Sequence, residues 1–173
     1  MKKAHIIKFD QQYSPIICEI RQTVFTLEQS IDADADLDGL DPLCLHILIE
    51  KNNKMIATGR MQKDGHIGRL AVLKPYRQSG VGTKILQMFF IEARKMGLKY
   101  VYLGAQEQAV AFYEKLEFER YGEEFMEEGI THVLMRRLIT SAPPQHHYYL
   151  KSNRSGQAKV LFQRNPAQSK SQK

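Results

Sequence analysis

A strand, a glycine-containing loop and a long amphipathic helix follow one another over residues 67–97. Residues 67–73 are mostly apolar and suit a buried strand, Pro75 marks its exit, and Gly80 and Gly82 stand where the helical pattern begins. Glycines at alternate positions let the backbone approach a ligand closely, and the N–H groups at a helix start attract an anion. The segment therefore predicts a fold built around a phosphate-binding strand–loop–helix unit.

The spacing excludes two common phosphate motifs. A P-loop needs four residues between its glycines and then Gly-Lys-Ser/Thr, whereas one residue separates Gly80 from Gly82 and Thr83 precedes Lys84. The dinucleotide motif G-x-G-x-x-G would need glycine at position 85, which is Ile85. We therefore expect a phosphate-bearing ligand of another class.

Length and composition favour one domain in the cytoplasm. The 173 residues can bury a sizeable core, contain no apolar run long enough to span a membrane, and begin without a signal-peptide pattern. Cys18 and Cys44 lie in apolar surroundings without metal-ligand spacing, so they are expected to be reduced, buried thiols.

The net charge of +6 is confined to the C-terminal end. Residues 139–173 hold six basic residues and no acidic one, so residues 1–138 are balanced. We predict a folded domain over 1–138 and a basic, partly disordered tail over 139–173, in which residues 158–162 are suited to a short strand. Docking of the tail on a neighbouring subunit and weak contact with nucleic acid are less favoured alternatives.

Hydrophobic periodicity predicts an α+β order with a mixed sheet. A first helix is expected to have Ser14 as N-cap and to bury Ile17, Ile20 and Val24. The helix after the loop is expected to end at Gly97 and to bury a stripe that includes Met96. The other predicted elements are strands over residues 5–9, 67–73, 100–105, 118–125 and 130–138, a hairpin of 43–50 with 54–61, and a helix over 108–116.

Several separated motifs resemble one family, the GNAT-type N-acetyltransferases. Arg77-x-x-Gly80-x-Gly82 is similar to the family's Q/R-x-x-G-x-G/A pyrophosphate loop. Residues 106–118 resemble its second signature, with Glu117 where glycine is usual. Four further segments are similar to the ElaA/YjcF branch: residues 25–29, 57–60, 105–106 and 129–132. The resemblance covers about residues 5–138 and implies the GNAT fold, a mixed twisted sheet flanked by helices.

The resemblance implies transfer of an acetyl group from acetyl-CoA to a primary amine, directly in a ternary complex and without a metal. It places the backbone of Leu70 and Val72 beside the pantetheine arm, with the Leu70 N–H donating to the acetyl carbonyl. The cofactor-binding residues that it implies are Leu70, Ala71, Val72, Arg77, Gln78, Ser79, Gly80, Val81, Gly82 and Thr83.

Acetyl transfer also needs an acid for the thiolate and a base for the amine. The resemblance points to Tyr113 as the acid, although its helical spacing also suits a core tyrosine. His66 is the candidate base, because some family members carry Glu or His there; as a residue next to a turn it also suits a solvated position. Other candidates at the acceptor site are Glu28, Glu127, His46 and His132.

The acidic loop over residues 28–41 has two interpretations. Residues 34–39 match the first half of an EF-hand loop, but Leu45 stands where a bidentate Glu is required, so no calcium site is predicted. A solvated surface loop is favoured. Alternatively Asp34, Asp36 and Asp38 border the acceptor site and attract a cationic amine.

Three other functions remain open at this stage. The chain could bind acyl-CoA as a regulatory module without turnover, use a longer acyl chain, or associate with nucleic acid through its tail. The acceptor is not readable, since small polyamines, aminoglycosides, amino sugars and protein lysines all suit such a fold. The oligomeric state, including a homodimer, is also left open.

Overall fold

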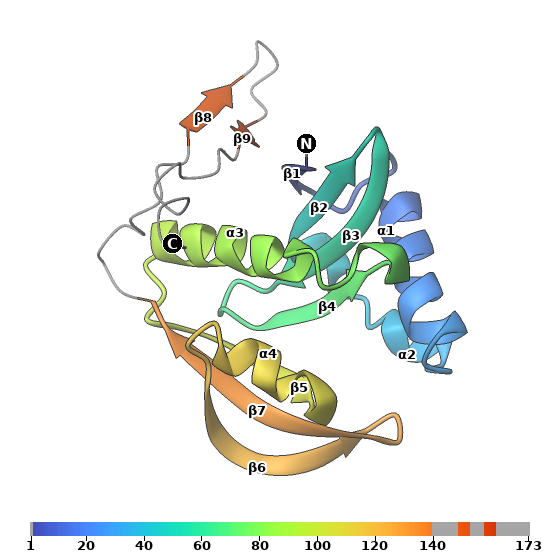
Figure 1. The fold of residues 1–173 in the computed structure, drawn as a ribbon, viewed down its shortest axis with the longest axis vertical. Helices are drawn as coiled ribbons and strands as arrows, with labels where there is room; N and C mark the ends of the chain where they lie inside the picture. The colour runs from blue at the N-terminus through green and yellow to red at the C-terminus, as the bar shows by residue number, and fades with distance from the viewer. Residues whose placement is uncertain (1, 140–148, 153–157, 162–173) are drawn as a thin grey trace, which may run out of the picture.

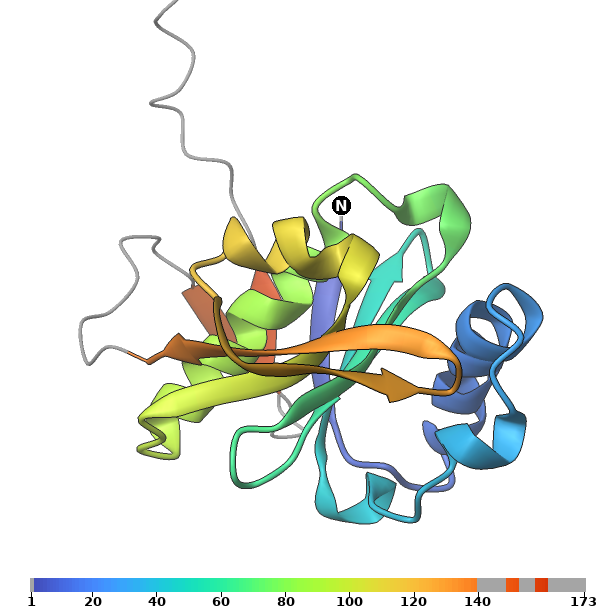
Figure 2. The same cartoon turned by 90° about the horizontal axis from the view of Figure 1, so that it is seen from below.

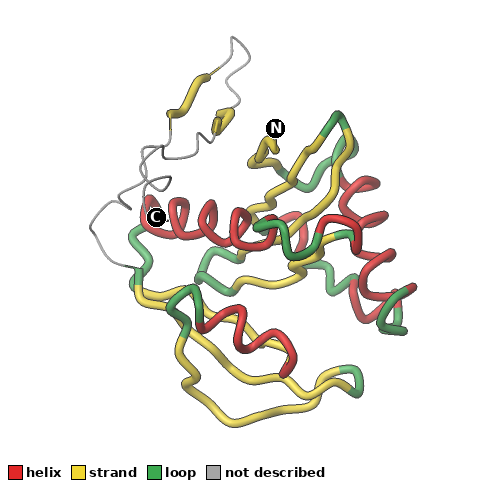
Figure 3. The backbone as a smooth tube through the Cα atoms, in the orientation of Figure 1, coloured by secondary structure: helices red, strands yellow, loops and turns green. Residues whose placement is uncertain are grey.

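Two β-sheets form the scaffold of the computed structural model, which describes residues 2–139, 149–152 and 158–161 (Figures 1 and 3). The strands are β1 (Lys2–Ile7), β2 (Leu45–Lys51), β3 (Lys54–Met61), β4 (Ile67–Val72), β5 (Tyr100–Gln106), β6 (Glu119–Glu127), β7 (Ile130–Leu138), β8 (Tyr149–Ser152) and β9 (Ala158–Leu161). The helices are α1 (Ser14–Arg21), α2 (Ala33–Asp36), α3 (Val81–Lys95) and α4 (Val110–Glu114), with a π-helical turn η1 (Gln22–Leu27) and 3₁₀ turns η2 (Asp41–Leu43), η3 (Lys74–Tyr76) and η4 (Glu107–Ala109).

The two sheets separate between β4 and β5. The larger sheet has the order β4-β3-β2-β1-β9-β8 and the smaller one β5-β7-β6, and all the pairs within them are antiparallel. An isolated parallel bridge joins His66, just before β4, to Tyr102 of β5. Beyond that bridge the strands belong to different sheets, which creates an opening beside β4. The predicted α+β class is confirmed.

The β2–β3 hairpin follows from its turn residues. Asn52 and Asn53 have φ of 51° and 60°, the left-handed backbone that a two-residue type I′ turn requires and that asparagine tolerates. The turn aligns Lys51 with Lys54. This predicted hairpin is confirmed.

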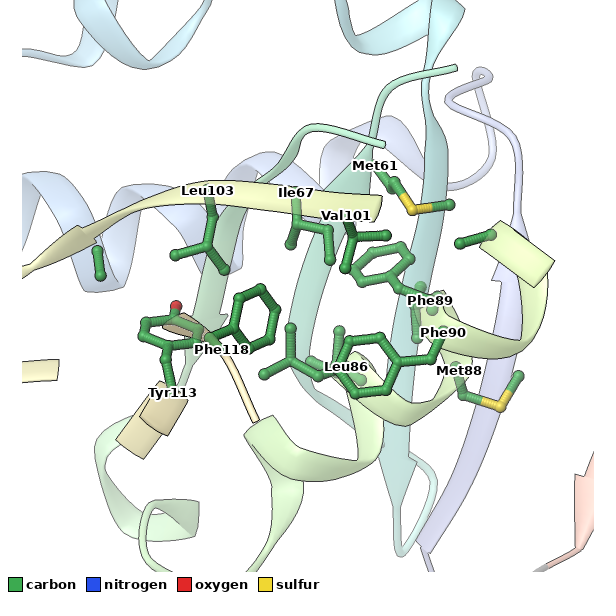
Figure 4. Close-up of a cluster of buried hydrophobic side chains, with 14 of the residues drawn as sticks. Met61, Ile67, Leu86, Met88, Phe89, Phe90, Val101, Leu103, Tyr113 and Phe118 are labelled. Atoms are coloured by element: carbon green, nitrogen blue, oxygen red, sulfur yellow. The ribbon is translucent and has the colours of Figure 1, made fainter. Parts of the chain in front are cut away.

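Helices α1 and α3 lie on opposite faces of the larger sheet (Figures 1 and 2). α3 buries Leu86 and Phe89 in the main core, where Figure 4 shows Phe89 beside Val101 of β5. α1 buries Ile17 and Ile20 in a second core against the other face. The main core thus packs α3, the helix that follows the glycine loop, against the smaller sheet.

Two helix predictions are wrong at their ends. Tyr13, not Ser14, is the N-cap of α1, because the Asp10 carboxylate accepts the N–H of Tyr13 at 3.1 Å and the Asp10 carbonyl accepts that of Ser14 at 2.8 Å. α3 ends at Lys95, so Met96 lies beyond its buried stripe and is 44% exposed. Gly97, with φ of 71°, terminates the helix as predicted.

The C-terminal segment contributes two strands to the larger sheet. β9 pairs with β1 through Ala4–Val160 and His5–Lys159, and β8 pairs with β9. Ile139, the first residue of the predicted tail, is buried in the main core. Apart from Ile139 and these two strands, the tail lies outside the described residues, and so does the prediction of its disorder. Among the helices that the structure describes, none is both long and apolar enough to cross a membrane.

Candidate active site

A cavity of about 420 Å³ occupies the opening between β4 and β5. β4 contributes Gly68 and Leu70, β5 contributes Tyr102, α4 contributes Tyr113, and the β6–β7 hairpin contributes Phe125. Residues 25–36 close the remaining side. Such a cleft at a strand opening, with apolar walls and a few polar groups, is the usual form of a small-molecule site.

A β-bulge interrupts β4 at the cavity. The β3–β4 register passes from Thr58–Ala71 to Arg60–Gly68, so Arg69 and Leu70 together face Gly59. Arg69 has φ of 52°, a left-handed conformation rare for arginine. The extra residue of the bulge interrupts the regular alternation of side chains along β4 between Gly68 and Ala71.

His66 stands where β4 and β5 meet. Its ring stacks on Tyr102 with centroids 4.9 Å apart and planes 4° apart, and its Nδ1 lies 3.0 Å from Nε2 of Gln62. Burial lowers the pKa of His66, against a smaller opposite effect of Asp64. The imidazole is therefore neutral near pH 7, the form that a base needs.

Tyr113 reaches the cavity from α4 with 8% of its surface exposed. Phe112 and Phe118 pack edge-on against its ring, with ring centroids 5.0 and 5.5 Å from that of Tyr113. Figure 4 shows the Tyr113 hydroxyl turned toward β5. Burial raises the pKa of Tyr113 well above that of a free phenol. The hydroxyl therefore stays protonated and can act as a donor.

The glycine loop presents backbone N–H groups at the start of α3. Gln78 and Gly80 have φ of 55° and 76°, and the N–H of Lys84 donates to the Gly80 carbonyl at 3.1 Å. The N–H groups of residues 81–83 precede that bond and have no acceptor within the helix. The Lys2 ammonium lies 3.1 Å from Ser79 Oγ and adds positive charge. This arrangement fits a phosphate group.

The profile of the acetyltransferase (GNAT) domain family matches residues 25–139. That range is well over half of the 173 residues. The chain belongs to the GNAT acetyltransferase family. It is therefore an acyltransferase of the class that uses acyl-CoA donors, and the predicted family and enzyme class are confirmed.

Relatives and solved structures agree with this assignment. The chain is 34% identical over 139 residues to the uncharacterized N-acetyltransferase YjcF of Bacillus subtilis, covering 78% of this chain and 99% of YjcF. It is 31% identical over 134 residues to protein ElaA of Escherichia coli, covering 73% and 88%. The crystal structure of that ElaA superposes with a TM-score of 0.71 at 28% identity, over 79% of this chain and 99% of ElaA. The predicted resemblance to the ElaA/YjcF branch is confirmed.

Arg77 of this GNAT enzyme folds back on the protein. Its Nη2 lies 2.6 Å from Glu28 Oε2, and its Nε donates to the Val72 carbonyl at 2.9 Å. The arginine therefore ties the loop to the end of β4 and to the residue after η1. Glu28 is engaged in this pair and does not line the cavity.

The acidic loop is exposed over much of its length, but Asp36 and Asp41 are buried in it. Three of its aspartates pair with arginines from α1, β3 and β4, and we call these six residues the Arg/Asp network: Arg21, Asp36, Asp38, Asp41, Arg60 and Arg69. Arg21 is fully buried, so the loop packs against the protein. Three carboxylates of the loop are balanced by three guanidinium groups, and Asp36 lines the cavity, so its part in attracting a cationic amine stays a prediction. Asp34 does not line the cavity.

Other predicted acceptor residues are divided between the cavity and the protein interior. His132 lines the cavity, stacks on Phe125 at 5.5 Å and lies 3.9 Å from Glu127. His46 is buried behind the network, with Nε2 2.9 Å from the Asp41 carbonyl, and does not line the cavity. Among the described residues no group of three or more His, Cys, Asp or Glu side chains is placed to hold a metal ion.

Sequence patterns did not indicate several of the cavity residues, among them Gln62, Arg69 and Tyr102. Gln62 contacts His66 across the Asp64–Gly65 turn, and only the turn geometry brings them together. Tyr102 alternates with the buried Val101 and Leu103 in β5, so strand periodicity could have placed it on the opposite face from the core.

Proposed function

We propose that this enzyme transfers an acetyl group from acetyl-CoA to a primary amine by direct transfer in a ternary complex. The observation that carries the proposal is that the glycine loop, β4 and the side chains of His66 and Tyr113 lie together. The glycine loop at the start of α3 follows β4 directly, and β4 borders the cavity that His66 and Tyr113 also line. A base, a carbonyl donor and a phosphate-binding loop thereby follow one another along β4, and the acid faces them from α4.

The loop residues hold the pyrophosphate in this proposal. The N–H groups of residues 78–83 and the Thr83 hydroxyl donate to it, while Arg77 shapes the loop through Glu28 and Val72. The backbone of residues 70–72 pairs with the pantetheine arm, and the Leu70 N–H donates to the acetyl carbonyl as negative charge develops on its oxygen.

His66 accepts the proton of the amine. In the present orientation the Gln62 amide donates to Nδ1, which places the ring proton on Nε2. Rotation of that amide by a half-turn lets Nδ1–H donate instead and leaves Nε2 as the acceptor for the amine proton.

Tyr113 donates to the departing sulfur. The same burial that raises the pKa of Tyr113 also raises that of a thiol held beside it, so the proton can pass between groups of similar affinity. Neither Cys18 nor Cys44 lines the cavity, which supports direct transfer over an acyl-cysteine intermediate. Their free thiols support the predicted cytoplasmic location.

Calorimetry with acetyl-CoA tests the loop. Gly80→Ala is a cleaner variant than Gly82→Val, because a Cβ on Gly82 would lie 3.2 Å from Phe112 Cζ, next to Tyr113. At Gly80 a Cβ has open space, but the φ of 76° disfavours alanine and reorients the loop N–H groups. We expect acetyl-CoA affinity to fall about tenfold or more, the equivalent of one charge-assisted hydrogen bond.

Gly97→Ala is the matched control. Gly97 has φ of 71° and equally open space at the far end of the same helix, so the backbone penalty is alike but the loop is untouched. Its acetyl-CoA affinity should equal that of the wild type. An equal loss of affinity in both variants, or none in Gly80→Ala, contradicts the loop assignment.

A further inference from the structure

The Arg69 side chain connects the β4 bulge to the acidic loop. Its Nε lies 3.0 Å from Asp36 Oδ1, and its Nη2 lies 3.4 Å from Asp38 Oδ2. The same guanidinium donates to the carbonyls of Ala35 and Asp36, each at 3.2 Å. One side chain from β4 thus makes four contacts with a single loop.

The backbone of Arg69 needs such support. Its φ of 52° is a left-handed conformation that is costly for a long side chain such as arginine, and the β3–β4 ladder skips this position. A strained residue persists only where its surroundings hold it. Within the described residues, the anchoring available to it comes from the side-chain contacts with the acidic loop.

The anchors are themselves fixed from behind. Arg21 Nε lies 2.8 Å from Asp36 Oδ2, Arg60 Nη1 donates to Asp38 Oδ1 at 2.8 Å, and Asp41 Oδ1 lies 2.8 Å from Arg21 and 3.0 Å from Arg60. Arg21, Asp41 and Arg60 are at most 3% exposed. The two aspartates that contact Arg69 are therefore held by further ion pairs to Arg21 and Arg60.

We infer that Arg69 is a positioning residue, and that the acidic loop serves as its anchor. The ion pairs hold residue 69 in the left-handed conformation, which in turn directs the N–H of Leu70, the next residue, at the acyl carbonyl. This inference rests on the proposed function, in which Leu70 supplies that donor. It gives the aspartates of the loop a role in catalysis without any contact to the acceptor.

Infrared spectroscopy of bound acetyl-CoA tests the inference before any acceptor is known. With ¹³C at the acetyl carbonyl, a hydrogen bond from Leu70 lowers the stretching frequency of the bound thioester. We expect a single narrow band in the wild type and a broader band at higher frequency in Arg69→Ala. Arg69→Lys retains the charge but cannot contact both aspartates, so its band is expected between the two.

Arg69→Gly separates backbone strain from loss of the anchor. Glycine adopts the left-handed conformation without penalty, so its band should lie closer to that of the wild type than the Arg69→Ala band does. Asp38→Asn removes one anchor from a partly exposed position and should shift the band in the same direction as Arg69→Ala. Arg136→Ala is the control, since Arg136 pairs with Glu119 at 2.9 Å on β7 and does not line the cavity.

The outcomes separate the inference from the function on which it rests. Failure of the wild type to bind acetyl-CoA in calorimetry overturns the proposed function and the inference with it. Normal binding with the same band in wild type, Arg69→Ala and Asp38→Asn overturns the inference alone. Once an acceptor is found, kcat of fully folded Arg69→Ala should fall about tenfold or more while KM for acetyl-CoA changes little.

Discussion

At the scale of single residues, burial acts on two titratable side chains of the cavity in opposite directions. It lowers the pKa of His66 and raises that of Tyr113, and both shifts favour the neutral form. The proposed base is thus unprotonated and the proposed acid protonated at the same pH. For Tyr113 burial is the cause of the shift, and for His66 burial outweighs the opposite effect of Asp64.

The His66 shift predicts the acid limb of the pH–rate profile. Because the pKa lies below the ordinary 6.5, the active neutral imidazole is lost only as the pH falls below that value. His66→Gln should lower kcat about a hundredfold near pH 7 and abolish this limb. Dividing the wild-type profile by the variant profile cancels the titration of the acceptor amine, which both enzymes share.

His5→Gln provides the matched control. His5 contacts Glu50 at 2.8 Å on β1 and does not line the cavity. Its profile should follow that of the wild type. If the ratio of the wild-type and His66→Gln profiles is constant from pH 5 to 8, another group is the base.

At the scale of elements, the Arg/Asp network fastens the acidic loop to α1. Arg21 is the buried link, and its removal would leave the carboxylates of Asp36 and Asp41 buried with fewer partners. We expect Arg21→Ala to lower the free energy of unfolding by about 3–5 kcal/mol, the usual cost of breaking a buried pair. Urea denaturation followed by circular dichroism measures it.

An exposed ion pair gives the comparison. Lys95 pairs with Glu92 at 2.6 Å in the last turn of α3, with 53% of the lysine side chain exposed. Lys95→Ala should cost less than about 1 kcal/mol. Comparable losses in the two variants would mean that the Arg21 contacts add little to stability.

Local patterns predict the elements of this fold better than they predict the site. The Asn52–Asn53 turn and the buried face of α1 follow from neighbouring residues, so the sequence suffices for them. The β4 bulge does not follow, because strand alternation assumes a regular ladder, and an arginine in the sequence does not indicate the left-handed backbone found at Arg69. The ion pairs of the acidic loop do not follow either, because Arg21 and Arg60, which pair with its aspartates, belong to other elements of the chain.

At the scale of the whole molecule, charge balance leaves the cavity negative. Arg60, Arg69 and Asp36 of the Arg/Asp network line the cavity. The network as a whole contains three positive and three negative groups, so it adds no net charge to the cavity. Glu127 and Glu128 also line the cavity, and among the described residues neither has a lysine or arginine partner. These two carboxylates favour an acceptor with a second positive charge.

A six-carbon series of amines tests this preference, because its members differ only in the distal group. We expect kcat/KM to be about three- to tenfold higher for 1,6-diaminohexane than for hexylamine, and lowest for 6-aminohexanoate. Glu127→Gln combined with Glu128→Gln should remove the difference, whereas Glu119→Gln, at the distant start of β6, should retain it. Equal rates with all three amines in the wild type would show that the carboxylates do not select the acceptor. A preference that survives the double variant would place the selecting charge elsewhere in the cavity.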